Sequence, residues 1–303
     1  MINFQRLTLA QKSEYDRILR ESTPRGCEYS FANQFLWGQQ QVAFFDDCIA
    51  FFAHFGGRSV YPYPIGSGDR KAVIQAIMAD ARERGIPLRI FSMTNADKAE
   101  LEGWFPGEFQ FHTDRDAFDY VYTADSLADL RGRKFQKKRN HFNRFQAEHP
   151  NFQVQKLDDS NLSTALGMVE EWFCTHQKED PHGNFLLERL ALSRAFRNYD
   201  ALQMEGILLL DEGRVLAVTM GSRLSEDTFD IHFEKALEDV EGAYNAVNCA
   251  FARYLRGKYP AVCYLNREDD MGLDGLRKAK LSYNPVCMVE KFWAYLPEEF
   301  YAD

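Results

Sequence analysis

Three ionisable side chains alternate along a short stretch near residue 230 and could carry out acid–base chemistry. Asp230, His232 and Glu234 are separated by the apolar residues Ile231 and Phe233. Because alternate side chains of a β-strand point to one face, we expect these three polar groups to share a face. A histidine between carboxylates is suited to general-base catalysis, since its neighbours raise its basicity. Either this face opens into a cleft, or the three groups pair with one another inside the protein.

The same stretch gives only a weak case for a metal ion. Two or three ligands on one strand do not close a coordination shell. The chain has no H-E-x-x-H pattern, and the pair Cys174-x-His176 is too sparse for a zinc site. We therefore expect no metal ion and no tightly bound cofactor.

The strand-to-helix turn that follows has residue types suited to binding a donor substrate. Glycine permits close backbone approach, and the first N–H groups of a helix can receive a phosphate or carbonyl oxygen. The acidic residues before the glycine oppose a phosphate and favour the ammonium of an aminoacyl group. An ordinary capped helix would explain the same pattern. The candidate binding residues of this turn are Glu241, Gly242, Tyr244, Asn245 and Asn248.

Polar residues gather again where a later apolar strand ends, in the run Asn-Arg-Glu-Asp-Asp at 266–270. Ligands of open α/β sheets bind beyond the carboxyl ends of the strands, so these residues are expected near a ligand. Lys280 or Tyr283, just downstream, could protonate a leaving group. An acidic loop that forms salt bridges with the basic helix after it is the alternative. The candidate binding residues here are Asn266, Glu268, Asp269 and Arg277.

Seven basic residues and no acidic residue lie between positions 131 and 144. At about 100° of rotation per residue, a helix would place three phenylalanines on one side and three basic residues opposite, in solvent. The phenylalanines are Phe135, Phe142 and Phe145, and the solvated residues are Arg133, Lys137 and Arg144. Arg131, Lys138 and Arg139 would lie near the buried face, where a cation needs an anionic partner. That partner is either a carboxylate of the protein or a phosphate of a bound ligand.

The elements that must position these residues follow the same order in two halves of the chain. Each half is expected to contain a helix, a hairpin, a strand, a helix, a strand, a helix and a strand. In the first half these are residues 7–20, 42–52, 59–65, 70–84, 88–93, 95–104 and 118–122. In the second half, a strand at 152–157 precedes elements at 162–173, 204–221, 228–234, 243–258, 261–265, 273–281 and 286–295. The repetition predicts two α/β domains, 1–124 and 151–303, joined by a basic interdomain helix at 125–150.

Composition narrows the class of protein further. The chain has 303 residues and a net charge of −9, which argues against nucleic-acid binding over the whole surface but allows a local basic site. The first residues form no apolar leader, and no apolar run approaches the roughly 18 residues of a membrane span. The six cysteines include no C-x-x-C pair, and we expect reduced, buried thiols. These features predict a soluble cytoplasmic protein.

Several motifs of the chain resemble those of a bacterial family related to the C-terminal domain of phosphatidylglycerol lysyltransferase. They cover nearly the whole sequence. In the first part they are Asp119-Tyr120-Val121-Tyr122 and Gly132-Arg133-Lys134-x-x-Lys137-Lys138-Arg139-Asn140-His141. In the second part they are His232-x-Glu234-Lys235-Ala236, Glu241-Gly242-Ala243-Tyr244-x-x-Val247-Asn248 and Asn266-Arg267-Glu268-Asp269-Asp270-x-Gly272-x-x-Gly275-Leu276-Arg277-x-x-Lys280-x-x-Tyr283-x-Pro285.

The resemblance implies two tandem domains of the GCN5-related N-acetyltransferase (GNAT) fold with mixed sheets. It also implies kinship with the Fem peptidoglycan aminoacyltransferases, in which aminoacyl-tRNA donates an amino acid to an amine or hydroxyl. The lysyltransferases join this domain to a long membrane region that the present sequence does not show, so a phosphatidylglycerol acceptor is not expected.

Together these inferences favour an acyl- or aminoacyltransferase whose donor is aminoacyl-tRNA or an acyl-coenzyme A and whose acceptor is an amine or hydroxyl. His232 or a neighbouring carboxylate would deprotonate the acceptor, and N–H groups near Gly242 would stabilise the oxyanion. Arg277 and the basic helix would hold phosphates. The alternatives are a non-catalytic ligand- or RNA-binding module that retains the fold, and a polar cluster that only cements the two domains.

Overall fold

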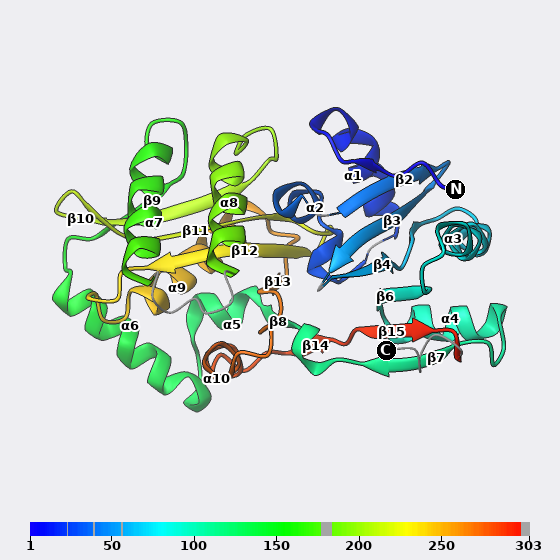
Figure 1. Cartoon of the computed structure of the whole chain (residues 1–303). Helices are drawn as coiled ribbons and strands as arrows, with labels where there is room; N and C mark the ends of the chain where they lie inside the picture. Colours follow the sequence, from blue (N-terminus) through cyan, green and yellow to red (C-terminus); the bar gives the residue numbers. More distant parts are fainter. Residues whose placement is uncertain (23, 39, 56, 177–183, 298–303) are drawn as a thin grey trace. The chain divides into compact units, whose positions relative to one another are not determined.

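The computed structural model describes residues 1–22, 24–38, 40–55, 57–176 and 184–297. They form two compact units (Figure 1). The first unit comprises Met1–Asp119, Asp269–Asp274 and Met288–Asp303, and the second comprises Tyr120–Glu268 and Gly275–Cys287. Both units are therefore built from segments that are discontinuous in sequence, whereas the predicted domains were continuous.

The first unit is built on a mixed sheet with the strand order β1-β2-β3-β4-β6-β15-β7, with β5 paired to β3. The pairing of β4 with β6 is parallel. The strands are β1 (Gln5–Arg6), β2 (Gln40–Phe45), β3 (Cys48–Phe55), β4 (Arg58–Pro62), β5 (Ile65–Gly66), β6 (Arg89–Met93), β7 (Gln110–Thr113) and β15 (Phe292–Tyr295). Its α-helices are α1 (Lys12–Ser22), α2 (Phe31–Trp37), α3 (Arg70–Arg84) and α4 (Asn95–Trp104).

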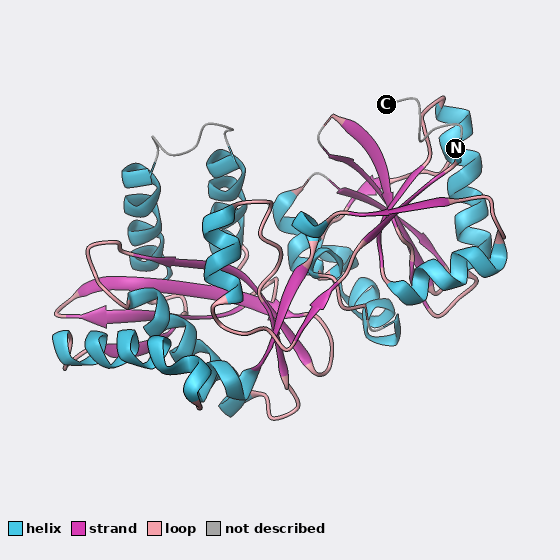
Figure 2. Ribbon diagram, turned by 90° about the horizontal axis from the view of Figure 1, so that it is seen from below, coloured by secondary structure: helices cyan, strands magenta, loops and turns pink. Residues whose placement is uncertain are grey.

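The second unit is built on a second mixed sheet, of order β14-β8-β13-β12-β11-β10-β9. The strands are β8 (Asp119–Thr123), β9 (Gln153–Lys156), β10 (Glu205–Asp211), β11 (Arg214–Arg223), β12 (Thr228–Ala236), β13 (Tyr264–Asn266) and β14 (Cys287–Val289). The helices are α5 (Ala124–Asp129), α6 (Gln136–Glu148), α7 (Leu162–His176), α8 (Asn184–Arg197), α9 (Ala243–Lys258) and α10 (Asp274–Leu281). Helices lie on both faces of this sheet (Figure 2), and α7 and α9 both contact β11 and β12.

Two strands lie in sheets that the sequence did not predict. β8 was expected to end the first half, but it pairs with β13 in the second sheet. β15 was expected in the second half, but it pairs with β6 and β7 in the first sheet. The alternation of side chains identifies a strand, but it does not tell which other strands that strand pairs with.

Local signals explain why several helices have their predicted bounds. The carboxylate of Asp69 accepts a hydrogen bond from the Ala72 N–H and caps α3, and Gly85 ends the helix in the left-handed conformation with φ of 65°. Ile74 and Ile77 of α3 are fully buried in the core of the first unit. The helix thus spans the predicted residues 70–84 because a cap, a stop signal and an apolar face agree.

A buried ion cluster joins two segments of the first unit, Met1–Asp119 and Met288–Asp303. The ammonium of Lys291 lies 2.7 Å from carboxylate oxygens of both Asp119 and Glu28. Asp119 also accepts a hydrogen bond of 2.8 Å from the backbone N–H of Cys27. Burial alone would lower the pKa of Lys291, but the negative charges, Asp119 foremost, outweigh it and raise that pKa well above its ordinary value. Lys291 is therefore charged throughout the neutral pH range.

Replacing Lys291 with methionine is expected to lower the free energy of unfolding by about 3–5 kcal/mol, because two buried carboxylates lose their cation. Urea denaturation at pH 7 measures this change. Because the folded-state pKa is raised, the contribution is complete below the unfolded-state pKa of about 10.4 and is lost only as the pH rises through the folded-state value. The exposed Lys71 is the control, and an equal loss in Lys71→Met would contradict the assignment.

Two expectations about the whole chain can also be compared with the structure. The six cysteines lie in the described part of the chain as thiols, but Cys174, Cys263 and Cys287 are exposed, contrary to the expected burial. Each adjoins a boundary of a helix or strand or faces outward from one, so the apolar neighbours in sequence do not cover it. Among the described residues, none of the helices has the length and apolar character required to cross a bilayer.

Candidate active site

The candidate site begins at the carboxyl end of β13, where its parallel pairing with β12 ends. The register joins Thr228–Asp230 of β12 to Tyr264–Asn266 of β13. After Asn266 the chain leaves this ladder, while β12 continues to Ala236 beside β11. Side chains at the carboxyl end of β13 can therefore reach across to β12, as expected for a ligand site of an α/β sheet.

A β-bulge changes which side chains of β12 share a face. The register between β11 and β12 shifts between Met220 and Gly221, so β12 contains one extra residue there. Phe229 packs on Phe251 of α9 with ring centroids 5.9 Å apart, and Asn248 of α9 donates a hydrogen bond to Glu234. The prediction that Glu234 shares a face with Asp230 and His232 is therefore wrong, because the extra residue reverses the alternation.

Glu234 belongs to a group that we call the Arg267 cluster. Its members are Lys138, Glu234, Asn245, Asn248, Arg267 and Tyr283. Arg267 Nη2 donates to Glu234 Oε1 at 2.8 Å, and Asn248 Nδ2 donates to Glu234 Oε2 at 3.2 Å. The Arg267 guanidinium lies 5.1 Å from the Tyr283 ring centroid, and Lys138 Nζ lies 3.9 Å from the same centroid. Two cations thus lie against one aromatic ring, and one of them, Arg267, also pairs with Glu234.

The two predicted proton donors hold the cluster in place. Asn245 Nδ2 donates to the Tyr283 hydroxyl at 2.7 Å, and burial raises the pKa of that hydroxyl. Lys280 donates through Nζ to the backbone carbonyl of Arg267 at 2.5 Å, and its own carbonyl accepts a hydrogen bond from Tyr122. Lys280 therefore positions the Arg267 backbone, and Tyr283 retains its proton at neutral pH.

Lys138 differs from an ordinary lysine in its proton affinity. Burial lowers its pKa to about 8, and the positive charges of Arg267 and Lys137 act in the same direction. The nearby carboxylate of Glu234 opposes this shift without cancelling it. At pH 8 about half of the Lys138 side chains are neutral and can accept a proton.

Two polar atoms of the Arg267 cluster are buried without a hydrogen-bond partner in the described part of the chain. They are Arg267 Nη1, a donor, and Asn248 Oδ1, an acceptor. Buried polar atoms are usually satisfied, so a donor and an acceptor left open on either side of Glu234 are available to a water molecule or to a ligand. Such a ligand would accept one hydrogen bond and donate another.

Asp230 and His232 lie apart from Glu234 in a separate group, which we call the His232 cluster. Its members are Ser222, Asp230, His232 and Glu268. His232 Nε2 is 2.8 Å from Ser222 Oγ, and its Nδ1 is 3.1 Å from Glu268 Oε1. The His232 side chain is only 1% exposed. This part of the face is therefore closed around the imidazole, which corresponds to the second of the two alternatives, internal pairing, rather than to an open cleft.

Glycine at position 242 brings the basic helix α6 against the start of α9. Gly242 has φ of 83°, and a Cβ atom there would lie 2.6 Å from the carbonyl oxygen of His141. Glu241 forms an ion pair of 2.5 Å with Arg144 of α6. The turn that was expected to bind a donor substrate thus packs against α6, the helix that contains Lys138.

Gly242→Ala is expected to lower the free energy of unfolding by about 1–3 kcal/mol, because it combines a strained backbone conformation with a clash against α6. Gly257 of α9 is a matched control, since a Cβ atom there has nothing within 4 Å. Gly257→Ala should instead stabilise the helix by about 0.5–1 kcal/mol. Thermal unfolding of both variants measures these changes. An unchanged stability of Gly242→Ala would contradict the close packing of Gly242 against α6.

Three basic residues predicted near a buried face have different environments. Lys138 lies against Tyr283, as described above. Arg131 is 87% exposed and pairs with Asp129, so its predicted burial is wrong, because α6 begins only at Gln136. Arg139 donates to the carbonyls of Leu130 and Gly132, so the backbone supplies its partners, in place of the carboxylate or the phosphate that the sequence left open. Phe135, Phe142 and Phe145 are buried and Arg133, Lys137 and Arg144 are exposed, as predicted.

The remaining predicted residues are not members of these two clusters. Asn266 is buried and accepts a hydrogen bond from the Glu268 N–H. Tyr244 is 39% exposed at the start of α9, and Arg277 is half-buried on α10. Asp269 belongs to the first unit. Arg267 was not among the predicted site residues, although its position directly after a strand end was a usable signal.

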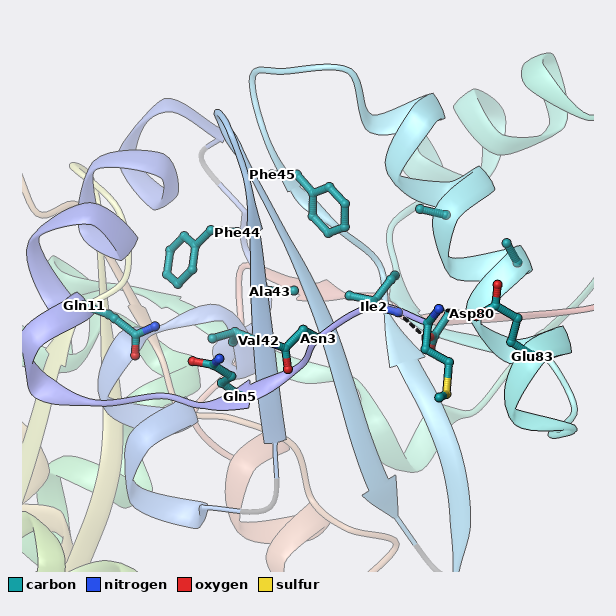
Figure 3. Close-up of a pocket in the computed structure, with 13 residues that line it drawn as sticks. Ile2, Asn3, Gln5, Gln11, Val42, Ala43, Phe44, Phe45, Asp80 and Glu83 are labelled. Carbon is teal, nitrogen blue, oxygen red and sulfur yellow. Dashed lines mark hydrogen bonds and ion pairs between the residues drawn. The ribbon is translucent and has the colours of Figure 1, made fainter.

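A cavity of about 570 Å³ lies in the first unit (Figure 3). Ile2, Ala43 and Phe45 lie on one side of it, and Asp80 and Glu83 of α3 lie on the other. Ile2 lies beside Asp80 (Figure 3), and its backbone N–H donates a hydrogen bond of 2.7 Å to that carboxylate. None of the residues predicted to do chemistry lines this cavity.

Comparisons with known proteins agree with this architecture. The family described as phosphatidylglycerol lysyltransferase, C-terminal, matches residues 19–295. A conserved protein of unknown function from Bacteroides thetaiotaomicron is 36% identical with a TM-score of 0.92, over 98% of this chain and 100% of that one. An uncharacterised protein of Mycoplasmoides gallisepticum is 25% identical over 57% of this chain, and the match spans about half of that protein (54%).

More distant structures share the fold. L-PGS from Bacillus licheniformis is 17% identical with a TM-score of 0.68, over 94% of this chain and 91% of that one. FemX is 11% identical with a TM-score of 0.64, over 99% of both chains. The prediction of an α/β protein with two mixed sheets and a tandem GNAT-like structure is confirmed.

Proposed function

Because this chain belongs to the family of phosphatidylglycerol lysyltransferase C-terminal domains, we propose that it transfers an aminoacyl group from an activated ester to an amine or hydroxyl acceptor. The reaction takes place at the Arg267 cluster. The observation that carries the proposal is the buried pair of open hydrogen-bonding atoms, Arg267 Nη1 and Asn248 Oδ1, on either side of Glu234.

An aminoacyl ester matches the open groups of this cluster. Its carbonyl oxygen accepts a hydrogen bond from Arg267 Nη1, and its amino group donates to Asn248 Oδ1 and to the carboxylate of Glu234. A simple acyl group such as acetyl has no N–H to satisfy Asn248, and leaving that acceptor buried and unpaired costs about 1–3 kcal/mol. The cluster therefore favours aminoacyl-tRNA over acetyl-coenzyme A as the donor.

Neutral Lys138 is the general base of the proposed reaction. It takes the proton from the attacking N–H or O–H of the acceptor as the new bond to the carbonyl carbon forms. The oxygen of the tetrahedral intermediate then carries the negative charge, which Arg267 stabilises. The bond from the carbonyl carbon to the ribose oxygen breaks, and the ammonium of Lys138 returns the proton to that oxygen. Donor and acceptor exchange one acyl group and one proton, and Lys138 is regenerated.

The roles first considered for three other residues change in this proposal. His232 is enclosed and engaged at both ring nitrogens, so we assign it no contact with the substrate. Tyr283 supplies the aromatic surface on which the two cations lie, and Lys280 fixes the Arg267 backbone. A non-catalytic binding module would use the same contacts to bind the donor, but it would not transfer the aminoacyl group.

A transfer assay distinguishes these functions. The full chain is incubated with tRNA charged with labelled amino acids, or with labelled acyl-coenzyme A, together with amines, lipid extracts and peptidoglycan precursors. Mass spectrometry then identifies any labelled product. The proposal predicts product from one or more aminoacyl-tRNAs. Transfer from acyl-coenzyme A alone would contradict the choice of aminoacyl-tRNA as the donor. Binding of a donor without any product would support the non-catalytic binding module instead.

A further inference from the structure

The His232 cluster brings together three groups that commonly bind metal ions. One ligand atom each from Asp230, His232 and Glu268 lies within 4.8 Å of the other two. The side chains of Asp230 and His232 are almost fully buried, and that of Glu268 is 21% exposed. All three residues belong to the second unit, and none is a member of the Arg267 cluster.

The distances between these atoms suit a small metal ion. His232 Nδ1 lies 3.1 Å from Glu268 Oε1 and 3.4 Å from Asp230 Oδ2. Bonds of about 2.0–2.2 Å in a tetrahedral zinc site place the ligand atoms roughly 3.3–3.5 Å apart. A charge-assisted hydrogen bond between nitrogen and oxygen is shorter, at about 2.7–2.9 Å. The 3.4 Å separation from Asp230 therefore matches the spacing of ligands around an ion, and the 3.1 Å separation from Glu268 lies between the two ranges.

The surroundings orient the ligands. Ser222 Oγ lies 2.8 Å from His232 Nε2, which leaves Nδ1 directed at the two carboxylates. Such hydrogen bonds to the far nitrogen of a metal-binding histidine fix its ring and tautomer. Glu268 has φ of 57°, an unusual conformation for a non-glycine residue, held by hydrogen bonds to Asn266 and from Tyr120. Strained residues of this kind are found where a side chain must be aimed.

A comparable group in the first unit shows a different arrangement. Cys27, Glu28 and Asp119 also bring ligand atoms together, but the ammonium of Lys291 lies 2.7 Å from both carboxylates. That group therefore contains a cation of the chain itself, and we infer no metal there.

We propose that Asp230, His232 and Glu268 bind one divalent metal ion, with zinc the best match to a mixed nitrogen and oxygen ligand set. Three protein ligands leave one tetrahedral position for water. The ion fixes Glu268, the residue next to Arg267, and so steadies the end of β13. This inference does not depend on the proposed aminoacyl transfer, because it concerns metal binding alone.

Metal titration of the full chain tests the inference. After treatment with a chelator, isothermal titration calorimetry with Zn²⁺ should show one ion bound per chain. Asp230→Asn and Glu268→Gln should each weaken binding by at least about 100-fold. His149→Gln is the matched control, since His149 pairs with a single carboxylate, Asp211, at 2.7 Å. It should leave the affinity unchanged, and circular dichroism verifies that each variant is folded.

Cobalt serves as a second, spectroscopic probe. Co²⁺ bound to nitrogen and oxygen ligands in a tetrahedral site should absorb in the visible range, without the charge-transfer band of a thiolate ligand. Absence of stoichiometric binding would overturn the inference. Binding that survives both ligand substitutions, or that falls equally in His149→Gln, would also overturn it. A thiolate band would assign the metal to exposed cysteines instead.

Discussion

Replacing Arg267 with lysine is expected to slow aminoacyl transfer by about 10²- to 10³-fold, the usual cost of removing one oxyanion donor. Lysine retains the positive charge opposite Glu234. It lacks the second nitrogen, however, that the structure leaves open beside Glu234. The effect should therefore fall on the rate of the chemical step, measured in single-turnover experiments with saturating protein, rather than on donor affinity.

Arg223→Lys is the matched control for this change. Arg223 also lies over a tyrosine ring, that of Tyr259, at 5.5 Å, but it is exposed at the end of β11. Its replacement should change the transfer rate less than twofold. A normal rate in Arg267→Lys would show that this guanidinium does not stabilise the transition state. Thermal unfolding of both variants separates loss of catalysis from loss of fold.

Replacing Lys138 with methionine is expected to lower the transfer rate by about 10²- to 10⁴-fold, because a general base contributes acceleration of this size. Methionine preserves much of the apolar packing on Tyr283 while removing the amine. Lys137→Met is the matched control, since Lys137 is the exposed neighbour on the same helix. An equal loss in both variants would indicate that positive charge on α6, rather than a base, is what matters.

The pH dependence of the rate distinguishes a base from a binding cation. The pKa of Lys138 is lowered to about 8, so its neutral fraction rises from roughly one tenth at pH 7 to nine tenths at pH 9. The transfer rate should rise across this range and level off above it. Lys138→Arg, which stays protonated, should lose both the activity and this rise. A cation that binds phosphate would give the opposite slope, since its charge is lost as the pH increases.

Much of the fold was readable from local signals in the sequence. The helices 70–84, 95–104 and 243–258 were predicted with the bounds that the structure has. The first two begin at a capping side chain, Asp69 or Thr94, and the third has a long buried apolar face. The hairpin of β10 and β11 was likewise predicted. Helix α8 was missed because its apolar residues surround the helix. Leu186, Leu187 and Leu190 are exposed, whereas the buried face is formed by Ala191, Leu192, Ala195 and Phe196, and no single apolar stripe marks it in the sequence.

The candidate site was only partly readable. Strand alternation pointed to Glu234, the glycine turn to Asn245 and Asn248, and the segment after a strand end to Lys280 and Tyr283, because those signals are local. The bulge in β12 depends on the pairing of that strand with β11. Because of the bulge, Glu234 lies on the face of the sheet that packs against α9. The contact of Lys138 with Tyr283 joins segments distant in sequence, and no periodicity reveals it. Long-range packing thus decided which of the charged residues form one site.

The most direct measurement is a crystal structure of the chain with a non-hydrolysable amide analogue of an aminoacyl-adenosine. The account predicts the analogue's carbonyl oxygen about 3 Å from Arg267 Nη1 and its amino group at the same distance from Asn248 Oδ1. Lys138 Nζ should face the carbonyl carbon from the side on which an acceptor would enter. An analogue bound in the cavity of the first unit, or one whose carbonyl points away from Arg267, would contradict the account.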